Sequence, residues 1–180
     1  MIYLLIYCFS IIPSHTYGKA SIDSLTENDF LFLKYDSIRN ESGYENLKGE
    51  LIIPIGRYPI CFTDTFKYYA IVMTADGRMT AIDRNEKILY DVFTFDNGPD
   101  YPSEGLFRII VDGKIGFADY STGEVIVKPQ FDCASQFVEG KAKVSHKCSK
   151  ILDGEHFTWK SDSWFYIDKS GKKIQSSELE

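Results

Sequence analysis

The sequence predicts an all-β protein built from tandem antiparallel repeats. Tyr and Phe are abundant, at 12 and 13 of 180 residues, and Val and Ile occur throughout, which is typical of strands. Gly, Asp, Asn and Ser interrupt the apolar runs every few residues, and no long segment shows helical periodicity. In addition, one pattern recurs about every 36 residues in about four units. The length and a hydrophobic content of 44% allow a single domain with its own core.

The first 20 residues differ from the rest and are predicted to be a signal peptide. The run MIYLLIYCFSII is apolar but too short to span a membrane as a helix, and Gly18 and Ala20 have the spacing that a signal peptidase recognises. Cleavage after Ala20 would give a secreted or periplasmic chain that begins at Ser21 and has no membrane span. No Lys or Arg precedes the apolar run, which leaves two alternatives open: a buried first strand or a wrongly assigned start codon. Residues 21–42 are predicted to form an N-terminal segment and the first strand.

The remaining chain contains copies of one unit. Residues 116–132 (GFADYSTGEVIVKPQFD) align with residues 43–59 (GYENLKGELIIPIGRYP), because each has Gly and an aromatic residue, a polar turn ending in Gly-Glu, and an aliphatic run that reaches Pro. Residues 69–91 form another copy, and the last comprises residues 141–148 and 164–174 with an insertion between them. The polar residues that close the second strand of each copy are 37, 36 and 49 residues apart: Asn46, Asp83, Asp119 and Asp168.

Each full unit is predicted to be a meander of three strands. The strands of the best-defined unit are predicted near 106–111, 115–119 and 124–127. Asp112-Gly113 is expected in the first turn, because a two-residue hairpin turn favours positive φ at both positions, and Pro129 is expected to end the last strand. Apolar and polar residues do not alternate cleanly in the first strand, so we expect both of its faces to be covered. One unit cannot cover both faces alone, so adjacent units are expected to stack.

Residues 104–144 resemble the WG-repeat family, also called KWG repeats. The family unit has an EG-small-x-x-V strand, a Gly-Lys-Trp-Gly turn, an aromatic-Ile-Asp strand, a Gly-Lys turn and an Ile-x-Pro-x-aromatic-Asp exit. The matching residues are Glu104, Gly105, Gly113, Lys114, Gly116, Phe117, Asp119, Gly123, Pro129, Phe131, Asp132, Phe137, Glu139, Gly140, Ala142 and Val144. The Trp-Gly pair of the family is replaced by Ile115-Gly116 in this unit, by Met79-Thr80 in the preceding unit and by Trp164-Phe165 in the last.

The resemblance covers residues from about 43 to 174, and we assign residues 43–180 to a WG-type β-repeat domain on this basis. It implies a β-rich scaffold found in bacterial, often exported, proteins, with no established enzymatic activity. The glycines and the Asp residues that follow the second strands are expected to serve the turns, because Gly permits positive φ and Asp accepts hydrogen bonds from turn backbone.

Charge and cysteine content exclude two classes of protein. The net charge is −6 and the isoelectric point is about 5.1, and basic residues nowhere cluster with aromatic ones, so we expect no nucleic-acid partner. The mature chain would retain Cys61, Cys133 and Cys148, which is too few for a disulfide framework. Cys133 and Cys148 either form one disulfide in an oxidising compartment or are small buried apolar side chains.

No motif of an established reaction is present. The sequence lacks G-x-S-x-G, G-x-x-x-x-G-K-[ST], G-x-G-x-x-G, H-E-x-x-H and C-x-x-C, so we expect no catalytic residue and no cofactor. Possible zinc ligands are His146, Cys148, Asp153, Glu155 and His156, and possible calcium ligands are Asp96, Asn97, Asp100 and Glu104. Neither group has an established ligand spacing, and polar loops have the same composition, so we predict no metal site.

The sequence therefore predicts an exported, non-enzymatic β-repeat protein that binds a protein or a cell-envelope ligand. The alternative is a hydrolase or a metal-dependent enzyme whose site lies between repeat units. Two segments depart from the repeat, residues 96–104 and the insertion at 146–164, and such departures often lie on the binding side of an array. The candidate ligand-binding residues in them are Asp96, Asn97, Asp100, Tyr101, Phe157 and Trp159. Phe157 and Trp159 could instead cap the open end of the last unit, and Trp164 is expected in the core.

Overall fold

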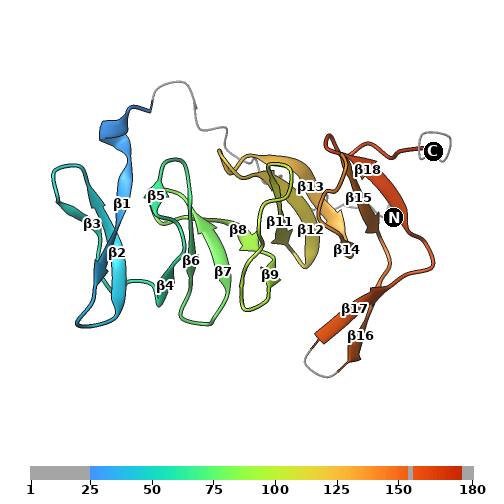
Figure 1. Cartoon of the computed structure of the whole chain (residues 1–180), viewed down its shortest axis with the longest axis horizontal. Coiled ribbons are helices and arrows are strands. Elements are labelled where there is room, and N and C mark those ends of the chain that lie inside the picture. The colour runs from blue at the N-terminus through green and yellow to red at the C-terminus, as the bar shows by residue number, and fades with distance from the viewer. Residues whose placement is uncertain (1–24, 154–155, 176–180) are drawn as a thin grey trace, which may run out of the picture.

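The computed structural model describes residues 25–153 and 156–175, and the expected signal peptide at 1–20 lies outside them. The described chain is all-β with antiparallel pairing, and its one helical element is a 3-10 turn at Glu27–Asp29. The strands stand side by side in an elongated row that runs along the chain from left to right in Figure 1. The predicted fold class is therefore confirmed.

The first unit is a three-stranded meander. Its strands are β1 (Leu31–Asp36), β2 (Glu41–Asn46) and β3 (Leu51–Ile53). The free edge of β1 pairs with β5 (Thr65–Phe66), which belongs to the connection to the next unit. The first unit thus begins with β1, and its middle strand starts two residues before the repeat that the sequence alignment detects.

The second and third units share one sheet. This seven-stranded sheet has the order β13-β12-β11-β8-β7-β6-β4. Unit 2 and its entry strand comprise β4 (Ile60–Cys61), β6 (Ala70–Met73), β7 (Met79–Ile82) and β8 (Ile88–Val92), and unit 3 comprises β11 (Leu106–Val111), β12 (Lys114–Asp119) and β13 (Val125–Phe131). The units join where β8 pairs with β11, and a small hairpin of β9 (Thr94–Phe95) and β10 (Gly98–Pro99) lies in the connection between them.

The fourth unit is interrupted by a hairpin. Its sheet contains β14 (Cys133–Ala134), β15 (Lys141–Ser145) and β18 (Phe165–Asp168). The insertion folds as a separate two-stranded sheet of β16 (Ser149–Asp153) and β17 (His156–Lys160). This hairpin extends from the right-hand end of the row in Figure 1. The repeat organisation predicted from sequence is thus present in part, because units 2 and 3 share one sheet and the last unit is interrupted.

The turn after the second strand is stabilised in the same way in every unit, although the turn of unit 3 is one residue longer. One side-chain oxygen of its first residue accepts hydrogen bonds from two backbone N–H groups of the turn at 2.8–3.0 Å. The four residues that do so are Asn46, Asp83, Asp119 and Asp168. Because Asx side chains stabilise turns in this way, the structural role expected for these residues is confirmed.

The first turn of unit 3 is also as predicted. Asp112 and Gly113 have φ angles of 51° and 73°, and Val111 is paired with Lys114 across the two-residue turn. These positive angles match the right-handed twist of the flanking strands. The hairpin between β11 and β12 therefore forms without a bulge at its turn.

The expectation that Pro129 ends the third strand is wrong. Strand β13 continues to Phe131, and the pairing moves from Phe117 opposite Val127 to Ile115 opposite Phe131, so two extra residues of β13 bulge outward. Pro129 lies in this bulge on an edge strand, where the missing N–H breaks no ladder bond. The bulge brings backbone against Gly116, where a Cβ atom would lie 2.5 Å from the Val127 carbonyl oxygen.

Apolar clusters fill the spaces between consecutive units. The cluster between units 1 and 2 includes Tyr44 and Ile82. The cluster between units 2 and 3 includes Ala81, Phe107 and Ala118. The cluster between units 3 and 4 includes Leu106, Phe117, Val144 and Ile167. Within β12, Phe117 faces unit 4 and Ala118 faces unit 2, because successive strand residues point to opposite faces. Both faces of the inner strands are covered, as the mixed pattern of β11 predicts.

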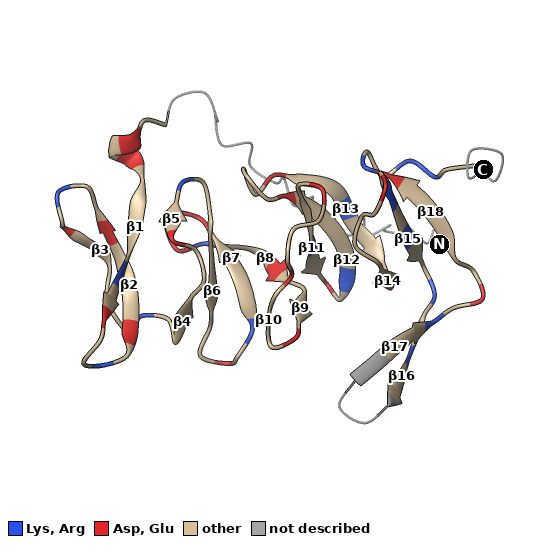
Figure 2. Ribbon diagram, in the orientation of Figure 1, with Lys and Arg blue, Asp and Glu red and all other residues tan. Residues whose placement is uncertain are grey.

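Charged side chains are unevenly placed along the row. Figure 2 shows acidic residues at many of the turns and basic residues on β15 at the right-hand end. Among the described residues, no helix is long and apolar enough to cross a membrane.

Candidate functional site

A buried ion pair joins units 3 and 4. Arg108 donates from Nη2 to Oδ1 of Asp100 at 2.6 Å and from Nε to Oδ2 at 3.0 Å. Its Nη1 donates to the carbonyl oxygen of Ala134 in unit 4 at 3.1 Å, and its guanidinium lies 4.0 Å from the ring centroid of Phe93. Asp100 is only 3% exposed. The carboxylate that the sequence offers as a ligand for calcium or a partner is therefore already engaged by Arg108.

Asp100 also belongs to a recurrent contact that sequence reasoning missed. In three units, a side-chain oxygen accepts the backbone N–H of the residue eight positions later, at 2.9 Å. The acceptor and donor residues are Thr63 and Ile71, Asp100 and Arg108, and Ser135 and Lys143. The sequence signal is a residue with a side-chain oxygen eight positions before the donor in the first strand of the unit. An alignment of the connections between units would detect it.

A second set of contacts links the Glu-Gly turns of units 3 and 4. The carboxylate of Glu104 accepts the backbone N–H of Gly140 at 3.1 Å and pairs with Lys169 Nζ at 3.0 Å. The hydrogen bond from Lys169, followed by that from Gly140, holds the pKa of Glu104 below its ordinary value of 4.5. Nearby, Ser103 Oγ donates to the Phe137 carbonyl oxygen at 2.6 Å. Hydrogen bonds to Glu104 and Ser103 thus hold the turn of unit 4 against that of unit 3.

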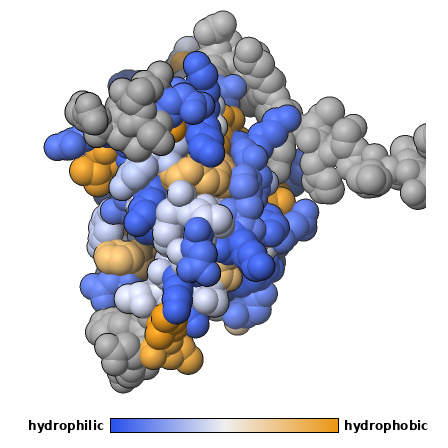
Figure 3. Space-filling view, turned by 90° about the vertical axis from the view of Figure 1, so that its right-hand side faces the viewer, coloured by the Kyte–Doolittle hydropathy of each residue, from blue (hydrophilic) through white to orange (hydrophobic). Residues whose placement is uncertain are grey.

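The outer face of unit 4 forms an open groove of about 590 Å³. Its lining consists of Ser135, Gln136, Val138, Glu139, Lys141, Lys143 and Tyr166. Ile167 packs into the cluster shared with unit 3, so the neighbouring Tyr166 points away from unit 3 toward the end of the row. Figure 3 views the molecule from this end and shows a mostly hydrophilic surface with small apolar patches.

Two ammonium groups and one carboxylate determine the charge of the groove. Lys141 and Lys143 come from β15, and Glu139 comes from the turn before it. Lys143 Nζ lies 5.1 Å from the ring centroid of Trp164, within the range of a cation–π contact. Trp164, which the sequence places in the core, is half-buried beneath this lysine and so partly exposed at the end of the row.

The candidate residues in the segment 96–104 have different surroundings. Asp96 and Asn97 form the two-residue turn between β9 and β10, with φ angles of 47° and 61°. Tyr101 is 67% exposed, and its carbonyl oxygen accepts a hydrogen bond from Gln136 Nε2 at 2.8 Å. Tyr101 is therefore held by its backbone and presents its ring to solvent, whereas Asp100 is buried beside it.

The insertion is attached to unit 4 at its base by a disulfide. Cys133 and Cys148 form a disulfide, and their Cα atoms are 6.1 Å apart. Of the two alternatives that the sequence leaves open, a disulfide or two buried thiols, the structure has the disulfide. Trp159 on β17 is half-buried and packs against the cluster between units 3 and 4. Trp159 thus packs at the junction of these two units, and its role in ligand binding stays a prediction. The side chain of Phe157 lies outside the described part of the chain.

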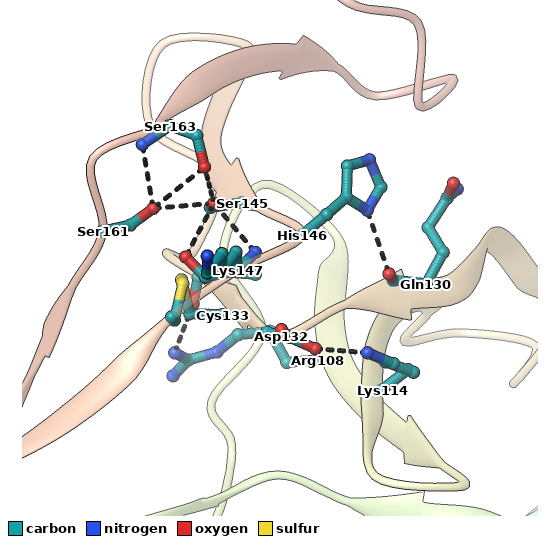
Figure 4. The surroundings of a disulfide bond; sticks show 12 residues. Arg108, Lys114, Gln130, Asp132, Cys133, Ser145, His146, Lys147, Ser161 and Ser163 are labelled. Carbon is teal, nitrogen blue, oxygen red and sulfur yellow. Dashed lines mark hydrogen bonds and ion pairs between the residues drawn. A yellow bond between two sulfur atoms is a disulfide. The ribbon is translucent and has the colours of Figure 1, made fainter.

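Three serine hydroxyls and the His146 ring lie near the disulfide and contact other residues of the chain (Figure 4). Ser145 Oγ lies 2.8 Å from Ser161 Oγ and 3.0 Å from Ser163 Oγ, so both ends of the insertion meet at one buried hydroxyl. The His146 ring lies 5.0 Å from that of Phe131 and 5.5 Å from that of Phe165.

Three of the zinc candidates of the sequence remain untested. In the described part of the chain, no three His, Cys, Asp or Glu residues are grouped to hold a metal ion. Glu155 and the side chains of Asp153 and His156 fall outside that part.

Comparison with known proteins identifies one segment. Residues 115–147 match the profile of a family described as "WG containing repeat". The match begins in β12, crosses β13 and β14, and ends just after β15, so it spans the junction between units 3 and 4. No curated protein matches the chain. The resemblance to WG repeats that the sequence suggests is therefore supported for residues 115–147.

Proposed function

We propose that this protein is an exported, non-enzymatic binding module that holds a protein or cell-envelope ligand at the C-terminal end of its repeat stack. The observation that carries the proposal is the groove on unit 4. Three of its lining residues, Lys141, Lys143 and Tyr166, occupy the positions at which Leu106, Arg108 and Phe117 of unit 3 contact unit 4. A surface of this kind binds by shape and hydrogen bonding.

Exposed side chains elsewhere on the same end of the molecule support a binding role. Tyr101 projects from the segment that departs from the repeat, and Leu152 on the inserted hairpin is 76% exposed. Aromatic residues at protein surfaces are frequent anchors of interfaces. Tyr101 and Leu152 would extend the contact area of a partner beyond the groove.

Export is supported by the disulfide between Cys133 and Cys148, because such bonds persist mainly in oxidising compartments. It is also supported by the apolar run and the small residues that precede Ser21. N-terminal sequencing of the protein from its native host should find Ser21 or a residue within a few positions of it. Recovery of a chain that begins at Met1 would contradict export by cleavage.

The binding role can be tested with residues 21–180 immobilised through the N-terminus and exposed to envelope extracts. We expect a partner to be retained in a saturable manner and to be competed by free protein. Heat-unfolded protein serves as the control for adsorption to denatured chains. Absence of any partner above this control would contradict the proposed function.

A further inference from the structure

We infer that the groove on unit 4 binds an extended segment of a partner protein that carries an aromatic side chain three residues before a glycine turn, with a carboxylate beside the aromatic residue. This inference rests on the proposed function and adds the location of the site and the chemistry of the partner. It follows from how unit 3 holds the equivalent segment of this chain, Ala134–Gly140.

Unit 3 holds that segment through its backbone and one aromatic ring. The carbonyl oxygens of Ala134 and Phe137 accept hydrogen bonds from Arg108 and Ser103 at 3.1 and 2.6 Å. The Phe137 ring meets the Phe117 ring edge-on, with centroids 4.7 Å apart. Additional bonds come from the Gln136 amide to Asp100 and from the Gly140 N–H to Glu104.

The same positions recur one unit later. Leu106 is paired with Asp119 in unit 3, and Lys141 is paired with Asp168 in unit 4, so the two pairs of strands have the same register. This register places Lys143 at the position of Arg108, and Tyr166 at the position of Phe117. It also places Glu139 at the position of Glu104, each as the first residue of a Glu-Gly turn with positive φ. The groove therefore retains a cationic donor, an aromatic platform and a carboxylate acceptor in equivalent places.

Two substitutions change what the groove prefers. Lys141 replaces the apolar Leu106, and Ser135 replaces the acidic Asp100, so the groove gains a positive charge and loses a negative one. In unit 3, Asp100 faces the Gln136 amide of the bound segment at 3.2 Å. A carboxylate at that place in the partner would lie beside Ser135 and near two lysines. We therefore expect an acidic residue where the internal segment has Gln136.

The available donors and acceptors favour another protein over a second copy of this chain. The Ala134–Gly140 segment of a copy is already held between its own units 3 and 4. At the opposite end of the row, β1 is preceded by the 3-10 turn at Glu27–Asp29. Residues 25–30 contain no glycine, so this segment has no equivalent of the Glu-Gly turn that unit 3 holds. End-to-end association would leave Glu139 and the Tyr166 ring without the contacts that Glu104 and Phe117 make.

The probe is a synthetic octapeptide with the sequence of residues 134–141, ASQFVEGK, with both ends blocked and with Gln136→Glu introduced in the peptide. It is titrated into isotope-labelled protein of residues 21–180 and followed by NMR. We expect saturable shifts at the amides of Gly140, Lys143 and Tyr166. Affinity should fall at least tenfold when the peptide carries Phe137→Ala, and several-fold when it retains Gln136.

Variants of the protein locate the site. Tyr166→Ala and Lys143→Glu should each weaken peptide binding at least tenfold, whereas Tyr35→Ala, at an exposed ring in unit 1, should leave it unchanged. Lys143 is exposed, so its variant keeps the test valid if Tyr166→Ala unfolds the protein. Saturable shifts confined to another surface, or none at millimolar peptide, would overturn the inference. Shifts at the groove that depend on protein concentration alone would overturn it in favour of self-association.

The two proposals fail separately. If envelope extracts yield a partner whose retention is unaffected by Lys143→Glu and Tyr166→Ala, the protein is a binding module but the groove is not its site. If the peptide binds at the groove while no envelope partner is retained, the site stands and the proposed cellular role does not.

Discussion

Asp100 and Arg108 form a two-pronged ion pair that is almost completely buried, with side-chain exposures of 0% and 9%. The backbone N–H of Arg108 also donates to Asp100 Oδ2 at 2.9 Å. Through Ala134, the same guanidinium reaches the next unit. One pair of residues therefore fixes the connection before β11 and the junction between units 3 and 4.

Removal of one partner of this pair should be strongly destabilising. Asp100→Leu leaves a buried guanidinium without its counter-charge, and a loss of about 3–5 kcal/mol is expected for such a change. The double variant Asp100→Leu with Arg108→Met should be less destabilised than the sum of the two single variants, because no charge remains buried. Urea denaturation of the four proteins measures the coupling. Additive losses would show that the two side chains act independently.

Gly116 is required by the close approach of β13. A Cβ atom there would lie 2.6 Å from the backbone nitrogen of Pro129, which cannot move away without shifting the bulge. We expect Gly116→Ala to cost about 1–3 kcal/mol, as in other overpacked sites. Gly98→Ala is the matched control, because its Cβ would have no neighbour closer than 3.8 Å and its φ is not positive. Equal losses in the two variants would contradict a steric cause.

The disulfide should stabilise the last unit by restricting its unfolded state. Cys133 and Cys148 are 15 residues apart, and a loop of that length corresponds to about 3 kcal/mol. Reduction of the native protein should therefore lower the free energy of unfolding by an amount of this order. The double variant Cys133→Ala with Cys148→Ala should be destabilised without reductant and should not respond when reductant is added. A response to reductant in the double variant would point to a different bond.

Glu104 should make stability depend on pH. Its pKa is lower in the folded protein than in the unfolded chain, so the stabilisation is present above the ordinary value of 4.5 and is lost as pH falls through the folded pKa. Glu104→Gln should therefore lower the melting temperature near neutral pH, and its effect should shrink as the pH falls through the folded pKa of Glu104 and the wild-type carboxylate becomes protonated.

Thermal unfolding of both proteins across this range checks the sign of the effect. Glu124→Gln is the control, because Glu124 forms no ion pair with any residue that the structure describes. An effect of Glu104→Gln that grows as the pH falls would contradict the prediction.

The features predicted correctly from sequence are those that neighbouring residues determine. Asp119 stabilises its turn through residues two and three positions later, and Asp112-Gly113 forms a turn by its own φ preferences. The prediction that Pro129 ends its strand was wrong, because the bulge that contains Pro129 packs against Gly116 on the neighbouring strand. Local rules end a strand at proline only where the missing N–H would be needed.

The candidate site was predicted less well, for a related reason. Asp100 lies among Gly, Pro and Tyr residues that are typical of an exposed loop, yet its partner is on a strand eight residues later. The groove on unit 4 has no local motif at all. It exists because Tyr166 repeats the position of Phe117 in a unit that is not followed by another one in the described chain.

The modular character of the stack gives a last prediction. Deletion of residues 84–119 joins Asp83 to Tyr120, which replaces one turn-closing aspartate by its equivalent and leaves every remaining strand with a partner of matching phase. Deletion of residues 84–101, half a period, removes β8, so that β11 follows β7 through the Glu104-Gly105 turn and the unit loses its third strand.

We expect the full-period variant to unfold in one cooperative urea transition with a smaller m-value, because it buries less surface, and at a lower midpoint, because the contacts of Arg108 and Glu104 are gone. The half-period variant should lose cooperativity, because strands without a matching neighbour leave their apolar faces unburied. Trp159 and Trp164 lie in unit 4 in both variants and report the transition by fluorescence, while circular dichroism reports the other units. Coincident curves are expected for the full-period variant alone. If both variants lost the cooperative transition to the same extent, the units would be parts of one indivisible sheet, and stacking would not be the source of stability.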